Sequence, residues 1–240
     1  MQARRVQKQP AFILQRRPYS ENSLLLDAFT REHGRVAVLA KGVRKLKSPQ
    51  RGLLHSFTPL CIAWSGRREL VTLTNAESFR KPFALEGQAL MCAWYASELI
   101  TRFLHRNDPH EGLFDAYAEL LERLEQEGRP EWSLRLFEKC LLSEAGYGLV
   151  LDLEVGGQVP IQSSSHYRYL PDRGPVLDQG DDFGGIAVSG RALLSLHQES
   201  YPGKAEQKEI KKLTRILLSI HLQGRDLKTR RVVRQLAAAW

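Results

Sequence analysis

The chain has 240 residues, of which 42% are hydrophobic and 26% are charged. This length supports one large domain or two ordinary ones, and this composition is typical of a folded globular protein, which excludes wholesale disorder. No apolar run approaches the roughly 20 residues that cross a bilayer. The basic start at 1–10 also lacks an apolar signal core. We therefore expect a cytoplasmic protein with two domains.

The net charge of +8 is distributed unevenly along the chain. Residues 1–85 hold 16 lysines and arginines against 5 aspartates and glutamates, residues 86–200 hold 9 against 19, and residues 201–240 hold 10 against 3. Partners respond to such local fields more than to the total charge. Two basic regions around an acidic middle are typical of a polyanion-binding module joined to a second domain, although chance clustering gives the same pattern.

Short β-type runs separated by turn residues fill the first third of the chain and predict five strands. Five short antiparallel strands within about 80 residues favour a small closed barrel of the OB type, although an SH3-like barrel gives similar spacing. We place an OB-fold nucleic-acid-binding domain at 1–82. The runs lie at 11–15, 23–29, 35–40, 57–64 and 69–74.

From residue 83 onward the apolar residues recur at helical spacing, which predicts a helical domain at 83–240 and an α+β, multi-domain protein overall. Glycine, proline and serine interrupt this pattern at 149–185. We expect an irregular insertion there, with one short hairpin at 166–170 and 175–177. The expected helices lie at 90–103, 113–124, 130–146, 191–198 and 204–222, and a last basic helix begins at about 227.

The densest cluster of charge is the segment 41–51 (KGVRKLKSPQR), which has basic residues at five positions and no acidic residue. It lies between the third and fourth β runs, where a loop is expected. A cationic loop of this kind follows backbone phosphates, and five contacts to a single strand give a slope of about −3.5 for log affinity against log salt. The residues expected to hold phosphates are Arg35, Lys41, Arg44, Lys45, Lys47 and Arg51, and Lys228 and Arg230 extend the path.

Aromatic side chains near these charges are candidates for stacking on bases. Phe12, Tyr19, Phe29 and Phe57 lie in or beside the β runs. We expect most of them to be core residues instead, because side chains alternate between the two faces of a strand and some of these rings should therefore point into the barrel.

Motifs that would indicate an enzyme are missing. There is no glycine loop for phosphates, no Gly-x-Ser-x-Gly and no His-Glu-x-x-His. Asp181 and Asp182 suggest a metal only weakly, because they lie in a glycine-rich turn. Cys61, Cys92 and Cys140 lack metal-ligand spacing and are expected to be buried thiols.

Several motifs, in this order, resemble the bacterial RecO family of recombination mediators. The segment 11–24 (AFILQRRPYSENSL) is followed by Phe29-Thr30, Gly34-Arg35, 40–44 (AKGVR) and 57–60 (FTPL). The resemblance continues through Leu134-Arg135, Phe137-Glu138, Gly146-Tyr147-Gly148, 167–169 (YRY) and 227–230 (LKTR), and so covers nearly the whole chain.

This resemblance implies an N-terminal OB fold, a helical C-terminal domain and a non-enzymatic role in DNA repair by recombination. Such proteins bind single- and double-stranded DNA and anneal complementary strands. With the partner RecR they help RecA to load on DNA covered by single-strand-binding protein. The resemblance also implies that Arg135 receives the acidic, Phe-ending tail of single-strand-binding protein, since a guanidinium beside an apolar groove suits a terminal carboxylate.

Some family members hold zinc with four cysteines in the irregular segment. The segment 149–185 contains no cysteine here, so we expect no metal and no cofactor. Three functions stay open: a nucleoid-associated DNA mediator, an adaptor whose basic patches bind acidic proteins, and a nuclease that uses Asp181 and Asp182. The first is favoured, and the third is the least supported.

Overall fold

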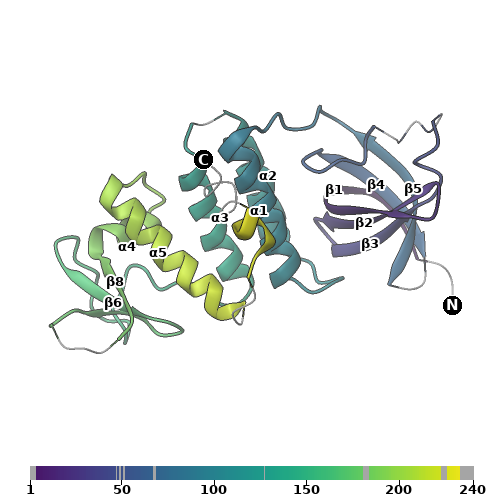
Figure 1. Ribbon diagram of the computed structural model, residues 1–240. Helices are drawn as coiled ribbons and strands as arrows, with labels where there is room; N and C mark the ends of the chain where they lie inside the picture. Colours follow the sequence, from purple (N-terminus) through teal and green to yellow (C-terminus); the bar gives the residue numbers. More distant parts are fainter. Residues whose placement is uncertain are drawn as a thin grey trace. The chain divides into compact units, whose positions relative to one another are not determined.

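The computed structural model describes residues 4–46, 48, 50, 52–66, 69–126, 128–180, 184–222 and 226–232 (Figure 1). Contacts divide the chain into two compact units, Met1–Gly128 and Arg129–Trp240. Among the described helices, none is long and apolar enough to cross a membrane. The expected domain boundary near residue 83 falls inside the first unit, between its strands and its helices, and stays a prediction.

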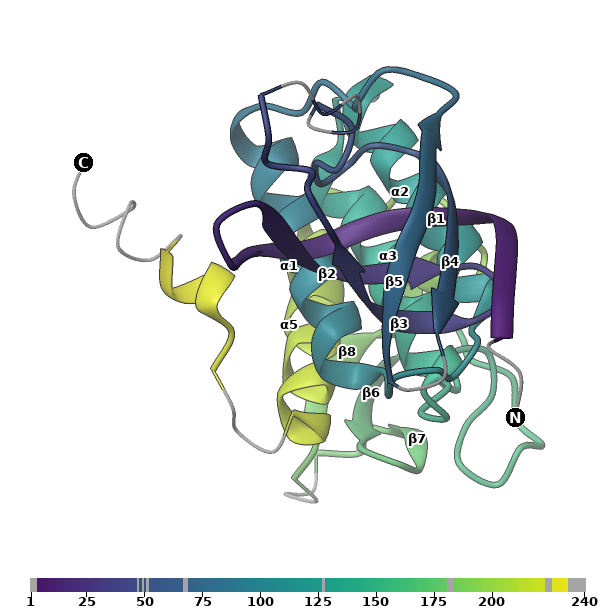
Figure 2. The ribbon, with the colours of Figure 1, turned by 90° about the vertical axis from the view of Figure 1, so that its right-hand side faces the viewer.

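The first unit contains a closed five-stranded barrel with the strand order β1-β2-β3-β5-β4 (Figure 2). β3 pairs with β5 in parallel, and the other neighbours are antiparallel. This confirms the expected barrel of the OB type. The strands are β1 (Arg4–Tyr19), β2 (Ser23–Thr30), β3 (Gly34–Ala40), β4 (Leu60–Gly66) and β5 (Leu70–Ser78).

β1 is much longer than the apolar run at 11–15 predicts. Its first part pairs with β4 up to Ala11, and its second part pairs with β2 from Ala11 to Tyr19. The register shifts between Ile13 and Gln15, and a β-bulge of this kind bends a strand. The bend lets β1 pair with two neighbouring strands. Ile13 is fully buried in the barrel core, with Leu26 of β2, Val38 of β3 and Ile62 of β4.

Two helices complete the first unit, α1 (Gly87–Phe103) and α2 (Glu111–Gln126). Phe12 and Phe29 of the barrel each lie 5.4 Å from the Phe114 ring of α2, measured between ring centroids. The Tyr117 hydroxyl lies 2.7 Å from Ser97 Oγ of α1, and burial raises the pKa of this tyrosine. Aromatic packing therefore joins the barrel to α2, and a buried hydrogen bond joins α2 to α1.

Gly34 opens β3 with a φ of 62°, and a Cβ built there would lie 1.9 Å from the Asp108 carbonyl oxygen. Gly42 has a similar φ of 71° but nothing within 4 Å. We expect Gly42→Ala to cost only the left-handed strain of about 1–2 kcal/mol. Gly34→Ala should cost clearly more, because the backbone of the 104–108 segment must also move. Urea unfolding of the two variants checks this difference, and equal losses would contradict it.

In the described part of the second unit, three longer helices and a short helical stretch at 228–232 accompany a small antiparallel sheet of order β7-β6-β8. The expected hairpin at 166–170 and 175–177 is present as β6 and β7, whereas the sequence did not predict β8. Ser189, at the end of β8, accepts a hydrogen bond from the Ala192 backbone and caps α4. The elements are α3 (Pro130–Glu144), β6 (His166–Leu170), β7 (Gly174–Leu177), β8 (Ile186–Ser189), α4 (Gly190–His197) and α5 (Lys204–His221).

Candidate nucleic-acid interface

The basic loop begins at the end of β3, and its first cations are exposed to solvent. Lys41, Arg44 and Lys45 are all exposed, and Gly42 turns the chain between them with its positive φ. Lys47 and Arg51 lie outside the described residues. The three described cations are therefore open to solvent, and their contact with phosphates stays a prediction.

Arg44 fastens this loop to the turn between β1 and β2. Its Nη1 donates to the Ser20 carbonyl oxygen at 3.1 Å, and its backbone N–H donates to the Asn22 carbonyl at 3.1 Å. The hydrogen bond from Nη1 uses one of the five guanidinium N–H groups, so others remain to face a phosphate. The start of the basic loop is thus held against one end of the barrel.

Two further cations, Arg16 and Arg17, lie on β1 near the same turn and are exposed. The register aligns Pro18 of β1, Leu24 of β2 and Ala40 of β3 across neighbouring strands. Arg17 and Lys41 therefore lie at the same end of this three-stranded sheet. These arginines were not among the predicted phosphate ligands, although two adjacent cations directly after the β run at 11–15 were the available signal.

His55 contacts Arg16 at this end of the barrel. The Nη1 of Arg16 lies 3.4 Å from Nε2 of His55. Burial, together with the positive charge of Arg16, lowers the pKa of His55. At neutral pH the imidazole is therefore uncharged, and it adds a hydrogen-bonding group but no charge to this surface.

Tyr19 is the only one of the four expected stacking residues that is exposed, at 49%. Phe12 and Phe29 are buried against α2, and Phe57 is buried in an edge-to-face contact with Trp94 of α1. These three rings cannot stack on a base without unfolding the unit. We name the surface formed by Arg16, Arg17, Tyr19, Lys41, Arg44 and Lys45 the barrel-end surface.

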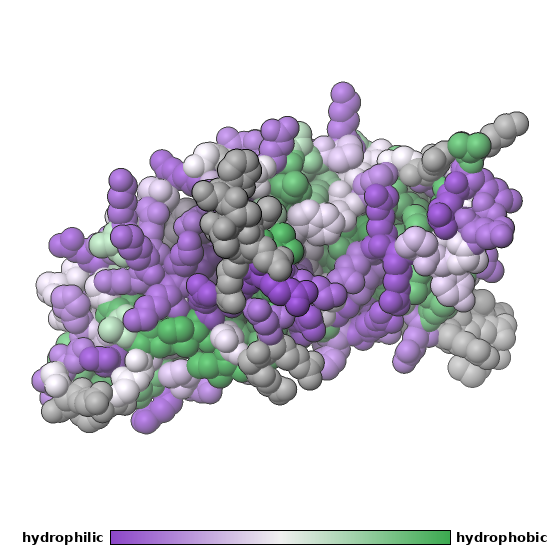
Figure 3. Space-filling model, viewed as in Figure 1, coloured by the Kyte–Doolittle hydropathy of each residue, from purple (hydrophilic) through white to green (hydrophobic). Residues whose placement is uncertain are grey.

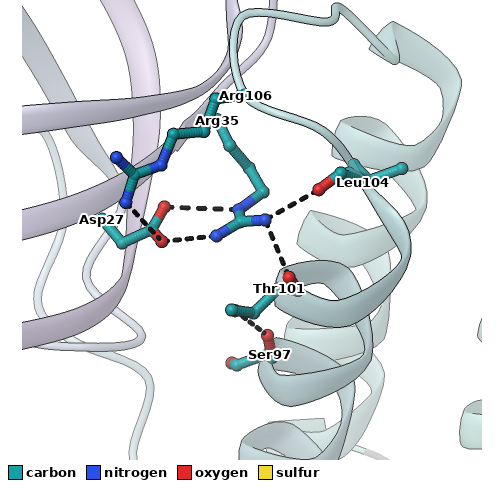
Figure 4. Close-up of polar contacts among 6 residues, drawn as sticks. All are labelled: Asp27, Arg35, Ser97, Thr101, Leu104 and Arg106. Carbon is teal, nitrogen blue, oxygen red and sulfur yellow. Dashed lines mark hydrogen bonds and ion pairs between the residues drawn. The ribbon is translucent and has the colours of Figure 1, made fainter. Parts of the chain in front are cut away.

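Arg35 does not belong to the barrel-end surface, which corrects its expected role as a phosphate ligand (Figure 4). Only 7% of the residue is exposed. Its Nη2 and Nε donate to the Asp27 carboxylate at 2.6 and 3.3 Å. Its Nη1 donates to the carbonyl oxygens of Thr101 and Leu104, both at 2.7 Å, at the end of α1. The side chain holds the barrel to α1 and has no room for a phosphate.

The C-terminal cations belong to the second unit. Lys228 is exposed and Arg230 is half-buried, within a short helical stretch at 228–232. This stretch agrees with the basic helix expected from about residue 227, as far as the chain is described. Their role in DNA binding stays a prediction.

Arg135 lies on α3 and is 8% exposed. Its Nη2 forms an ion pair with Glu138 Oε1 at 3.0 Å, and its Nη1 donates to Thr214 Oγ1 of α5 at 3.1 Å. Its Nε is buried and has no hydrogen-bond partner among the described residues. One donor of this guanidinium thus stays available for a carboxylate that reaches it.

Asp181 and Asp182 lie outside the described residues. Within the part of the chain that the structure describes, no three histidine, cysteine, aspartate or glutamate side chains are grouped so that they could hold a metal ion. Cys92 is buried, and Cys61 and Cys140 are half-buried, so the expectation of fully buried thiols is met only in part.

The strand order and the cationic loop place the N-terminal region in the class of OB-type barrel proteins. Two family models match the chain: "Recombination protein O N terminal" over residues 1–81 and "Recombination protein O C terminal" over residues 85–231. The chain therefore belongs to the RecO family of DNA repair proteins.

Individual relatives agree with this assignment. The chain is 46% identical to a DNA repair protein RecO of Coxiella burnetii, over 96% of this chain and 99% of the relative. It is 42% identical to the RecO of Nitrosococcus oceani, over 97% of this chain and 94% of that one. The RecO of Aromatoleum aromaticum is 41% identical, over 98% of both chains.

Proposed function

We propose that this protein is a non-enzymatic recombination mediator that binds single- and double-stranded DNA through the barrel-end surface and anneals complementary strands. The observation that carries the proposal is the connection of the exposed basic loop to the β1–β2 turn through Arg44. This connection gathers five arginines and lysines and one exposed tyrosine at one end of the barrel. Cations that follow phosphates and an aromatic ring that stacks on bases are the usual components of a single-strand site.

The proposed contacts carry no sequence preference. Lysine and arginine side chains that face phosphates fix the strand but do not read base edges. This suits a protein that must act wherever DNA is damaged. Lys47, Arg51, Lys228 and Arg230 remain proposed members of the DNA path.

Reversing three charges tests the barrel-end surface. In the variant Lys41→Glu/Arg44→Glu/Lys45→Glu we expect binding of an oligo-dT strand to be lost at about 150 mM salt. Any residual binding should show a salt slope smaller in magnitude by about 2, because three contacts at about 0.7 each are removed. Fluorescence anisotropy over a salt series measures both quantities.

A matched control separates local contacts from net charge. Lys45→Glu and Arg123→Glu change the total charge equally, but Arg123 lies on α2 and pairs with Glu119 at 2.5 Å. Only Lys45→Glu should weaken binding. Equal effects of the two variants, or unchanged affinity of the triple variant, would refute the assignment of this surface.

The partners RecR, single-strand-binding protein and, indirectly, RecA complete the proposed function. Support for the tail contact comes from the buried Nε of Arg135, which has no acceptor among the described residues. A competing function is an adaptor that binds acidic proteins through the same cations. Titration with an oligonucleotide and with an acidic tail peptide at one salt concentration separates the two functions, because a pure adaptor binds only the peptide.

A further inference from the structure

A row of cations covers one side of α5 in the second unit. Apart from one adjacent pair, neighbouring members are three or four residues apart along the helix, and at about 100° per residue all of them lie within an arc of about 100°. The opposite side is buried at Ile210, Leu213 and Leu217. We name this row the α5 ridge; it consists of Lys204, Lys208, Lys211, Lys212 and Arg215, all of which are exposed.

Acidic residues of α5 do not lie on the ridge. Glu209 projects to another side, where it accepts hydrogen bonds from the backbone N–H and the hydroxyl of Ser189 at 2.8 and 2.6 Å. Helical spacing places Glu206 outside the arc as well. The space-filling view shows hydrophilic side chains over the region of α5 (Figure 3).

Most cations of the ridge have no ion-pair partner among the described residues. Lys211 forms an ion pair with Glu131 of α3 at 3.0 Å. For Lys204, Lys208, Lys212 and Arg215, none of the residues that the structure describes provides a side-chain partner. Like charges at this spacing repel one another along a helix, so a bound polyanion would relieve that repulsion.

An exposed aromatic ring lies next to the start of the ridge. Tyr201 is three residues before Lys204, and 48% of it is exposed. The guanidinium carbon of Arg129 lies 4.0 Å from the centre of its ring, and Trp132 supports it edge-to-face at 6.2 Å. The ring is therefore held in place while half of the residue stays open to solvent. Such a tyrosine with a stacked arginine can receive a base.

We propose that the α5 ridge and Tyr201 form a second single-strand-binding surface, separate from the barrel-end surface. The ridge extends about 16 Å from Lys204 to Arg215, at about 1.5 Å per residue. At the spacing of about 3.4 Å that each strand has in a B-form duplex, that length covers about five phosphates, and a more extended single strand places fewer phosphates along it. Tyr201 stacks on a base at the end of this phosphate track.

Other polyanions fit the same features less well. An anionic membrane would need an apolar helix face to insert between lipids, and that face of α5 is buried in the unit. An acidic peptide would match the charge but would leave the exposed ring of Tyr201 without a role. A single strand uses both the cations and the ring.

One chain with a strand site on each unit can hold two strands at once. If the barrel-end surface also binds DNA as proposed, this property would supply the simplest physical basis for annealing. The α5 ridge does not depend on that proposal, since all of its residues belong to the second unit.

The test uses the full chain in the barrel-end variant Lys41→Glu/Arg44→Glu/Lys45→Glu, in which three of the five barrel-end cations are reversed, so that the second unit contributes most of the remaining binding. We expect this variant to retain weak oligo-dT binding at about 50 mM salt. Adding Lys208→Ala/Lys212→Ala/Arg215→Ala should abolish that binding, and alanine keeps the helix intact. Adding Tyr201→Ala instead should weaken it by about 5- to 150-fold, whereas Tyr201→Phe should preserve it.

The control is Arg173→Ala/Arg191→Ala, which removes two exposed cations of the same unit outside the ridge, and should change little. Equal loss in the control, or no binding by the barrel-end variant before the ridge is altered, would overturn the proposal. Ridge variants that keep oligo-dT binding but lose a poly-glutamate peptide would overturn it in favour of a protein partner. Undiminished binding by the barrel-end variant, lost on ridge substitution, would refute only the barrel-end assignment.

Discussion

Replacing Arg35 with alanine should destabilise the first unit by about 3–5 kcal/mol. The substitution leaves the Asp27 carboxylate, whose side chain is 11% exposed, without its bidentate partner. It also removes the donor shared by the carbonyl oxygens of Thr101 and Leu104 at the end of α1. Buried polar groups that lose their partners pay the cost of desolvation without compensation.

Hydrogen exchange of the β2 and β3 amides is the suitable measurement, because it reports on the first unit separately from the second. Arg106→Ala provides the control. Arg106 lies 4.0 Å from the same Asp27 carboxylate, but its side chain is 45% exposed. We expect a cost below about 1 kcal/mol there. A stable Arg35→Ala variant that has lost DNA binding would return Arg35 to the phosphate ligands.

The predicted role of Arg35 as a phosphate ligand differs from its buried contacts for a physical reason. Strand alternation and local charge density are visible in a sequence, and both made an arginine beside the basic loop look like a phosphate ligand. Besides Asp27, its acceptors are the carbonyl oxygens of Thr101 and Leu104 at the end of α1, which lie 66 and 69 residues away in the sequence. No local pattern predicts a contact between a strand and the end of a distant helix.

The difference between local patterns and long-range contacts also explains which elements were predicted from the sequence and which were not. The five β runs and the long helices were predicted because their apolar periodicity is local. The full length of β1 was missed because its outer parts are polar and are ordered by pairing with β4 and β2. β8 was missed because its four residues become a strand only by pairing with β6.

Only part of the candidate site was predicted, and the reasons are similar. Charge density identified Lys41, Arg44 and Lys45, which the structure exposes together. Arg16 and Arg17 join them only through the register between β1, β2 and β3. The α5 ridge was not predicted, because its cations are spread over 204–215 among apolar and acidic residues and form a row only once the segment is helical.

Replacing Arg135 with alanine should destabilise the second unit by about 3–5 kcal/mol. The ion pair with Glu138 is buried, and the Glu138 side chain has no exposed surface. Without Arg135 this carboxylate loses its ion-pair partner inside the protein, and Thr214 of α5 loses its donor. Amide exchange of α3 and α5 should rise accordingly. Binding of the acidic tail peptide would also be lost, but for a reason that need not involve direct contact.

A double substitution separates these two roles. Arg135→Met/Glu138→Leu replaces the buried pair by apolar side chains of similar size, which is often neutral or stabilising. We expect normal exchange protection of α3 in this variant. If Arg135 receives the terminal carboxylate, tail binding stays lost although the unit is folded, because no guanidinium remains. Recovery of tail binding together with stability would show that Arg135 supports the fold alone, and the proposed tail contact would then have to move to another cation of the second unit.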